Sequence, residues 1–164
     1  ILTPKLNLFL NPILMSFSSP TKVTPSNIPS VALAILYQDG RFLMQLRDNI
    51  PTIIYPDRWG FFGGHLEPGE TPEIGVKREV LEEINYKIEN PIFFRNYDDD
   101  EAFRHIFHAP LTVSIDDLIL REGADLGFVS PEEVKKGQCY SKKLGDVRPL
   151  GKIHQEILLD FISK

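Results

Sequence analysis

The sequence has little cysteine, no excess of positive charge and no long uninterrupted apolar run. Its single cysteine, Cys139, excludes an internal disulfide and fits a reducing compartment such as the cytosol. The neighbours Tyr140 and Lys142 do not build a nucleophile site around it, so we interpret Cys139 as a surface or packing residue. The formal net charge of -5 gives no general affinity for nucleic acid polymers.

The most apolar part of the N-terminal segment, residues 8–17, is interrupted by Asn11 and Pro12. It is therefore too short to span a membrane. The segment also lacks the basic start and the small-residue cleavage site of a secretory signal. We expect a cytoplasmic protein with no membrane partner.

Five prolines divide residues 1–30, and the first methionine is Met15. We expect natural translation to start at Met15, so that residues 1–14 are not part of the natural protein. Residues 16–29 are interpreted as a mobile linker. The expected organisation is a flexible N-terminal extension over residues 1–29 and one folded domain over residues 30–164.

Hydrophobic patterning places strands in both halves of the domain, which is long enough for one full core at 42% hydrophobic residues. The apolar run 31–37 predicts a strand buried on both faces, and Asp39-Gly40 after it is a hairpin signal. Strands are expected at 31–37, 41–47, 59–62, 86–97 with a bend at Asn90-Pro91, 102–113 and 125–129.

The remaining segments are predicted to be helices and loops. Ser130-Pro131 with Glu133 has the pattern of a capped helix start, and residues 149–163 have the spacing of an amphipathic helix. Loops are expected at 48–57, at the acidic tip 98–101 and at 137–148, with a short helical turn within 116–121. This order predicts an α/β or α+β fold, with a mixed sheet flanked by helices and neither a repeat nor a second domain.

Residues 64–86 form the most informative stretch, a loop with Gly64 and Gly69 that leads into a helix. Thr71 suits the N-cap and Pro72 the first helical position. The buried stripe of this helix is expected to hold four aliphatic residues, Ile74, Val80, Leu81 and Ile84. Gly75 lies inside the helix at a cost of about 1 kcal/mol relative to alanine, and we interpret it as merely tolerated.

Three carboxylates, those of Glu79, Glu82 and Glu83, are spaced to project from one side of this helix. Like charges at such spacing destabilise a helix unless a partner neutralises them. Oxygen ligands suit hard divalent cations, so the pattern points to Mg²⁺, with Mn²⁺ as the alternative.

The stretch reads G-x5-E-x7-R-E-V-x-E-E and resembles the signature of the Nudix hydrolases. The matching residues are Gly64, Glu70, Arg78, Glu79, Val80, Glu82 and Glu83. Asn85 stands where that family has glycine, and asparagine is the next best residue for a left-handed helix end. Tyr86 replaces an aliphatic residue, which we expect to affect packing only.

The resemblance implies an α/β/α sandwich with a mixed sheet, and hydrolysis of a diphosphate linkage in a nucleoside diphosphate derivative. It implies that Glu79 and Glu83 bind metal, that Glu82 is a ligand or the catalytic base, and that the Gly64 carbonyl also reaches a metal. It also implies that Glu70 and Arg78 form a structural pair that braces the glycine loop. A homodimer is the assembly that the family suggests.

Other residues outside the signature are candidates for the site. Glu101, Glu122 and Asp125 are alternative bases, although each is more simply a surface acid. Arg47 could bind phosphate, His65 could touch the substrate, and Trp59 could stack on a nucleobase, although a core tryptophan is the more frequent case. We interpret the other three histidines as structural: His105, His108 and His154.

We infer the substrate class by excluding subgroups of the Nudix family whose additional motifs this sequence lacks. The secondary motifs of ADP-ribose, dinucleoside polyphosphate and NADH hydrolases are absent from the expected positions. Cleanup of nucleoside triphosphates or cleavage of a nucleotide-sugar is left as the expected activity. One alternative is an isopentenyl diphosphate isomerase, which would need a catalytic cysteine, but Cys139 lies far from any suitable motif. The other is a non-enzymatic nucleotide sensor, and the intact signature carboxylates argue against it.

Overall fold

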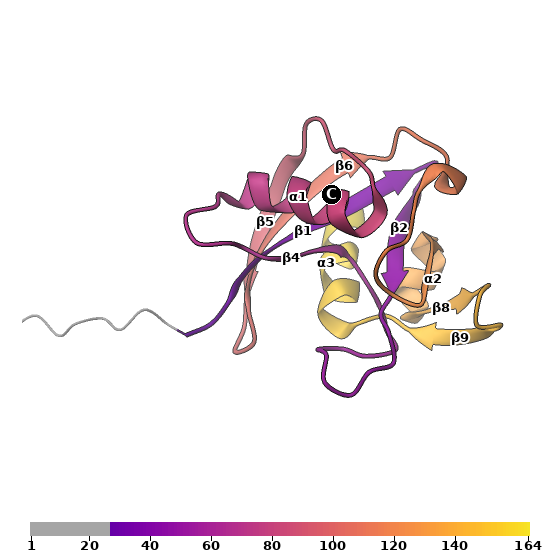
Figure 1. Ribbon diagram of the computed structural model, residues 1–164. Coiled ribbons are helices and arrows are strands. Elements are labelled where there is room, and N and C mark those ends of the chain that lie inside the picture. Colours follow the sequence, from indigo (N-terminus) through magenta and orange to yellow (C-terminus); the bar gives the residue numbers. More distant parts are fainter. Residues whose placement is uncertain (1–26) are drawn as a thin grey trace, which may run out of the picture.

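The structure is a computed structural model that describes residues 27–164 (Figure 1). The expected start at Met15 and the extension up to residue 26 lie outside the described residues. The first strand, β1 (Ser30–Gln38), begins at the predicted start of the folded domain. Among the described residues, no helix is long and apolar enough to cross a membrane.

A mixed seven-stranded sheet forms the centre of the domain. Strand β1 pairs antiparallel with β2 (Arg41–Leu46) and β4 (Phe62–His65), and parallel with β6 (Phe103–Pro110). The sheet is completed by β3 (Trp59–Gly60) and β7 (Asp125–Val129) beside β2 and by β5 (Ile92–Asp98) beside β6. The predicted hairpin between β1 and β2 is present, with Asp39 and Gly40 both at positive φ.

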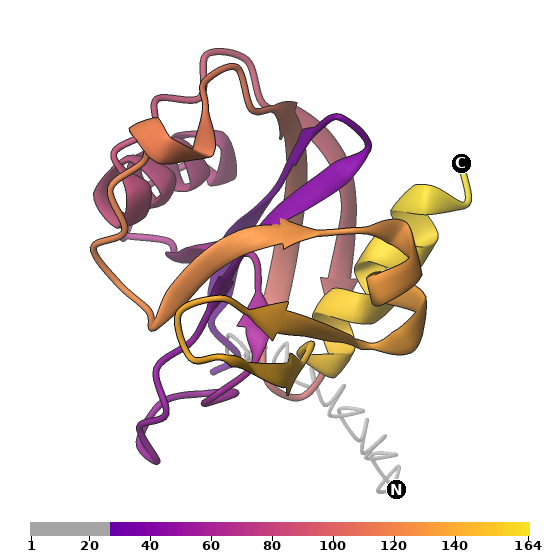
Figure 2. The same ribbon diagram turned by 90° about the vertical axis from the view of Figure 1, so that its right-hand side faces the viewer.

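Helices cover both faces of the sheet, which confirms the expected α/β/α sandwich (Figure 2). Alternate residues of β1 point to opposite faces: Leu33 and Ile35 enter one hydrophobic core, and Ala34 and Leu36 the other. Helix α1 (Pro72–Ile84) packs on the second core, and α3 (Lys152–Ile162) on the first. A short helix, α2 (Pro131–Lys136), contacts α3 and carries the predicted capping box at Ser130.

The boundaries of several elements differ from the sequence-based expectation. Strand β5 begins at Ile92 rather than at Tyr86. Tyr86 lies outside it, with its side chain buried and its hydroxyl donating to the Pro110 carbonyl over 3.1 Å. The expected loop 137–148 is instead the hairpin of β8 (Gln138–Ser141) and β9 (Asp146–Pro149). The expected helical turn within 116–121 is a 3₁₀ turn over Ile115–Asp117.

The buried stripe of α1 is rotated relative to its prediction. Ile74 and Leu81 are 58% and 44% exposed, whereas Val76, Val80 and Ile84 are fully buried. The stripe also includes Gly75 and Glu83. The helix therefore presents one of its signature carboxylates to the interior of the protein rather than to solvent, and this rotation determines the geometry of the site.

Candidate active site

Strand β4 packs closely against strand β1 and helix α1 because it carries two adjacent glycines, Gly63 and Gly64. Gly63 has a φ of +137°, and a Cβ there would lie 2.1 Å from the Ala32 carbonyl oxygen. A Cβ on Gly64 would lie 2.7–2.8 Å from the carboxyl group of Glu79. Gly64 was expected in a loop, but it belongs to β4. Glycine at position 63 therefore lets β4 approach β1, and glycine at position 64 lets the Glu79 carboxylate reach the β4 backbone.

Glu83 is the most buried of the signature carboxylates, with 4% of its surface exposed. Its Oε2 atom accepts hydrogen bonds from Gln45 Nε2 and from the Gly63 amide, each over 3.3 Å. Burial raises the pKa of Glu83 to about 8, despite the Gly63 hydrogen bond that lowers it. The charges of Glu79 and Glu122 raise this pKa further.

Glu79 and Glu82 have different surroundings although both contact Arg78. Burial raises the pKa of Glu79, and the hydrogen bond from Arg78, 2.9 Å long, opposes that rise. The Glu82 side chain is 58% exposed, and its carboxylate accepts from Arg78 over 3.3 Å. Within residues 27–164, no cluster of three or more His, Cys, Asp or Glu side chains converges on one point where an ion could bind. The metal-binding role assigned to Glu79, Glu82 and Glu83 stays a prediction.

The predicted pair of Glu70 and Arg78 is present as a two-pronged ion pair. Arg78 Nε donates to Glu70 Oε1 over 2.7 Å, and Nη2 donates to Oε2 over 2.9 Å. The Arg78 hydrogen bonds, together with one from the Glu67 amide, lower the pKa of Glu70 to about 2. Arg78 also donates to the His65 carbonyl, so it ties the loop before α1 to the end of β4.

Gly75 supports this pair, contrary to the interpretation that it is merely tolerated. A Cβ at Gly75 would lie 2.4 Å from Leu66 Cδ2 and 3.1 Å from Glu70 Oε2. The missing side chain therefore gives the loop residues Leu66 and Glu70 room to pack on α1.

A cavity of about 550 Å³ opens beside these carboxylates. Glu79, Glu83, Gly63 and Gly64 line one part of it. Arg47 and His65, both sequence-based candidates, line it as well, and so do Glu101 and Glu122. Arg47 Nε donates to the Ile54 carbonyl over 2.8 Å, which connects β2 to the loop that borders the cavity.

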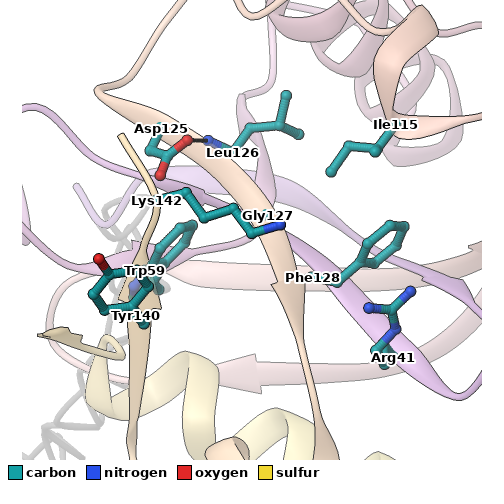
Figure 3. A pocket seen from close by; sticks show the side chains of 9 residues that line it. All are labelled: Arg41, Trp59, Ile115, Asp125, Leu126, Gly127, Phe128, Tyr140 and Lys142. Atoms are coloured by element: carbon teal, nitrogen blue, oxygen red, sulfur yellow. Dashed lines mark hydrogen bonds between the residues drawn. The ribbon is translucent and has the colours of Figure 1, made fainter. Parts of the chain in front are cut away.

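The other two candidates, Trp59 and Asp125, lie at a second cavity of about 330 Å³ (Figure 3). Trp59 is 1% exposed, and its indole N–H donates to the Cys139 carbonyl over 3.1 Å. The Asp125 carboxylate accepts from Ser141 Oγ over 2.6 Å. Neither residue lines the cavity beside the acidic helix, so they are poor candidates for that site.

Three further residues of the large cavity had no role in the sequence-based site: Tyr55, Arg104 and His154. Arg104 is buried on β6, and its Nη1 atom lies 2.9 Å from Asp99 Oδ2. The Tyr55 hydroxyl donates to Glu101. No spacing rule in the sequence joins these residues, because they come from a loop, a strand and the last helix. The acidic tip 98–101 is exposed, as expected, and two of its residues, Asp99 and Glu101, also form ion pairs with Arg104.

Comparison with known proteins gives the same family as the signature. The family model of the NUDIX domain matches residues 27–147. The chain belongs to the Nudix family. Among solved structures, a NUDIX hydrolase from Nitrosomonas europaea superposes with a TM-score of 0.64 at 19% identity, covering 85% of this chain and 73% of that one. MutT from Aliivibrio salmonicida or Vibrio cholerae superposes with a TM-score of 0.62 at 18% identity, and the alignment covers 82% of this chain and 97% of that one.

Two curated relatives match shorter stretches of this Nudix chain. A MutT-like protein of Streptomyces ambofaciens is 38% identical over 79 residues, 47% of each chain. The nucleoside triphosphatase NudI of an Enterobacter strain is 42% identical over 36 residues, 22% of this chain and 26% of that protein. The aligned stretches therefore span less than half the length of either relative.

Proposed function

We propose that this protein is a Mg²⁺-dependent phosphoanhydride hydrolase that cleaves the diphosphate linkage of a nucleoside diphosphate derivative. The observation that carries the proposal is the meeting of a half-buried carboxylate, Glu79, and a buried one, Glu83, with a glycine backbone at a cavity that arginines also line. Membership of the Nudix family supports the same conclusion.

A hard divalent cation would suit the chemistry of the site, because its donors are carboxylate oxygens whose burial is only partly compensated by positive partners. Burial raises the pKa of both Glu79 and Glu83, and Glu122 adds a third negative charge nearby. A bound Mg²⁺, or Mn²⁺, would neutralise phosphate charge and lower the pKa of an attacking water. Glu79 and Glu83 would hold the ion, with the Gly64 carbonyl and Glu82 as further ligands; Glu82 would first leave Arg78.

The protein's own residues supply the remaining functions of the proposed mechanism. Glu82 is our first candidate for the base that takes a proton from water, and Glu101 and Glu122 remain alternatives on the cavity wall. Arg47 offers a positive charge to a phosphate oxygen at the same cavity. The ion pair of Arg78 with Glu70 holds the glycine strand and the acidic helix in register.

Cleanup of nucleoside triphosphates is the substrate class that we favour over nucleotide-sugars. The support comes from the two curated relatives, which are described as MutT-like and as a nucleoside triphosphatase. We further propose that the protein acts in the cytoplasm, as the single cysteine suggests, and that it forms a homodimer, which remains a family-level expectation.

Neither alternative function gains support from a particular observation. An isopentenyl diphosphate isomerase would need a reactive cysteine. Cys139 is instead buried in the core that α3 covers, and burial raises its pKa to about 12, which disfavours the reactive thiolate. A sensor without activity would be expected to lack some signature carboxylates, whereas Glu79, Glu82 and Glu83 are all in place.

The test is a substrate screen with the four ribonucleoside triphosphates, the four deoxyribonucleoside triphosphates and several nucleotide-sugars. Wild type, Glu83→Gln and Glu82→Gln are each assayed with Mg²⁺, with Mn²⁺ and with EDTA, and the released phosphates are quantified. Glu132→Gln, an exposed change on α2, is the control. We expect turnover only with metal, lost in the first two variants and retained in the control. Tight nucleotide binding without turnover by wild type would refute hydrolysis and favour the sensor.

A further inference from the structure

The last helix contributes a histidine to the cavity, from outside the residues that the family model matches. The NUDIX match ends at residue 147, whereas His154 lies in the first turns of α3. His154 lines the same cavity as Glu79 and Glu83. It is only 8% exposed, so its ring belongs to the inner wall of the cavity rather than to the rim.

The protein is built closely around this ring. A Cβ at Gly151 would lie 2.7 Å from His154 Cδ2, and one at Gly60 would lie 3.4 Å from both Cε1 and Nε2. The rings of Phe61 and Tyr55 meet it edge-on, with centroids 4.8 and 6.2 Å away. The orientation of the imidazole is therefore fixed from several sides, as expected for a group that must present one atom in one direction.

One hydrogen bond determines which nitrogen carries the proton. The Phe61 backbone N–H donates to His154 Nδ1 over 3.2 Å. A neutral imidazole that accepts at Nδ1 must carry its hydrogen on Nε2. Burial, with the nearby charges of Arg104 and Arg47, lowers the pKa of His154 to about 3, so the ring is neutral at physiological pH.

The Nε2–H group has no hydrogen-bond partner in the part of the chain that the structure describes. The Nε2 atom of His154 is also not fully buried. Among the described residues, His108 Nδ1 is the one fully buried side-chain nitrogen or oxygen atom without a hydrogen-bond partner. A purely structural histidine would use both of its nitrogens or expose one at the surface. Here one nitrogen anchors the ring and the other is left available at a cavity wall.

We propose that His154 is a specificity-determining residue, whose Nε2–H donates a hydrogen bond to a carbonyl oxygen or ring nitrogen of the substrate's nucleobase. The inference rests on the proposed function. Arg47 lines the same cavity as Glu83 and His154, and its charge lowers the pKa of both groups. A nucleotide with its phosphates near Glu83 and Arg47 would then place its base toward His154.

The same geometry excludes two other roles for this histidine. A general base or a metal ligand needs a free imidazole lone pair, but the Nδ1 lone pair is taken by Phe61 and Nε2 carries the hydrogen. A neutral donor that does not titrate gives recognition that is constant over the physiological pH range. It therefore selects a base by its acceptor pattern rather than by charge.

The decisive experiment observes the histidine nitrogens of the wild-type protein by NMR with ¹⁵N-labelled histidine. His154→Gln assigns the His154 signal among the four histidines. GMP, AMP, CMP and UMP are added in turn to saturation in EDTA, so the readout does not depend on catalysis. We expect the Nε2–H tautomer at every pH from 5 to 8, and a shift of Nε2 with at least one nucleotide. His105, which hydrogen-bonds Ser30 and does not line the cavity, should stay unchanged.

Binding constants of His154 variants give a second measurement. In His154→Phe we expect the ratio of dissociation constants between the best and the worst nucleotide to fall about tenfold, the loss of one good hydrogen bond. His154→Gln, whose amide can still donate, should retain part of that ratio.

An Nδ1–H tautomer, or a His154 signal that no nucleotide moves, would overturn the inference. Hydrolysis of nucleotides with an unmoved His154 signal would leave the proposed function standing without it. A shifted signal in a protein that hydrolyses no diphosphate would refute the proposed function and keep His154 as a nucleotide contact.

Discussion

Replacing Glu83 with glutamine should stabilise the metal-free protein while removing its proposed activity. The carboxylate is 4% exposed and burial raises its pKa to about 8, so the folded protein holds an unfavourable charge at high pH. Both hydrogen bonds to Glu83 end on a single oxygen, Oε2, and the amide oxygen of glutamine can accept both of them. The exchange therefore removes the buried charge and keeps the contacts of Gln45 and Gly63.

The magnitude follows from linkage between protonation and folding. The pKa rises from 4.5 to about 8 on folding. At pH 7 the difference amounts to about 3 kcal/mol of lost stability, because one pKa unit corresponds to about 1.4 kcal/mol. Burying an amide in place of the acid offsets part of this, which leaves about 2 kcal/mol. For a chain of 164 residues that gain raises the melting temperature by on the order of 4–8 °C.

The sign of the pH dependence is fixed by the direction of the pKa shift. A carboxyl whose folded-state pKa is raised stabilises the fold fully below its unfolded pKa, here 4.5. That contribution is lost as the pH rises toward about 8. The gain in stability of Glu83→Gln over wild type should therefore be absent near pH 4.5 and should increase up to about pH 8. Thermal or urea unfolding in EDTA measures this gain.

Glu82→Gln is the matched control, since it removes a carboxylate from the same helix at an exposed position. It should change the melting temperature little at any pH. The reasoning is refuted if Glu83→Gln destabilises the protein in EDTA at pH 7, or if its effect does not depend on pH. Added Mg²⁺ should stabilise wild type more than Glu83→Gln, because a cation would compensate the charge that the variant lacks.

Three further changes test the supports of the site. Gly75→Ala should destabilise the protein by up to about 2 kcal/mol, because the clash with Leu66 outweighs a helix-propensity gain of about 1 kcal/mol; unfolding in urea measures it. Arg78→Lys should lower kcat by about tenfold or more, because an ammonium cannot reproduce the two-pronged bond to Glu70, whereas an unchanged kcat would make this pair dispensable. Tyr86→Phe should cost about 1 kcal/mol without changing kcat, since its hydroxyl bonds are remote from the cavity.

Local signals in the sequence predicted much of the fold. The hairpin at Asp39-Gly40, the cap at Thr71 and the left-handed end of α1 at Asn85 each depend on the conformation of one or two residues. Residues 125–129 were predicted as a strand with its observed bounds. Such features need no knowledge of distant contacts, which explains why a single sequence predicts them.

Features that depend on tertiary packing were predicted less well. The observed buried stripe of α1, Val76, Val80 and Ile84, has helical spacing of its own, but nothing in that spacing indicates that Glu83 is buried beside it. There Glu83 accepts hydrogen bonds from Gln45 and Gly63, which lie on other strands. The need for glycine at position 75 comes from Leu66, outside the helix. The hairpin of β8 and β9 lacks a two-residue turn signal and is held partly by Asp125.

The same distinction applies to the candidate site. The acidic helix and its glycine loop are contiguous in sequence, so spacing alone identified them. Arg104 and His154 come from β6 and α3, and no motif relates them to residue 64 or residue 83. Only the fold brings them to the cavity, which is why His154 was interpreted as structural.

The distribution of charge on α1 explains why Glu83 should be the residue most affected by a cation. Arg78 contacts the carboxylates of Glu70, Glu79 and Glu82, so each of these has a positive partner within the protein. Glu83 has no such ion pair within residues 27–164, and the more distant Arg47 only partly opposes its raised pKa. A bound Mg²⁺ would therefore contribute to folding what Arg78 contributes to the other acids. The stabilising effects of Mg²⁺ and of Glu83→Gln should then be less than additive, because both remove the same unfavourable charge.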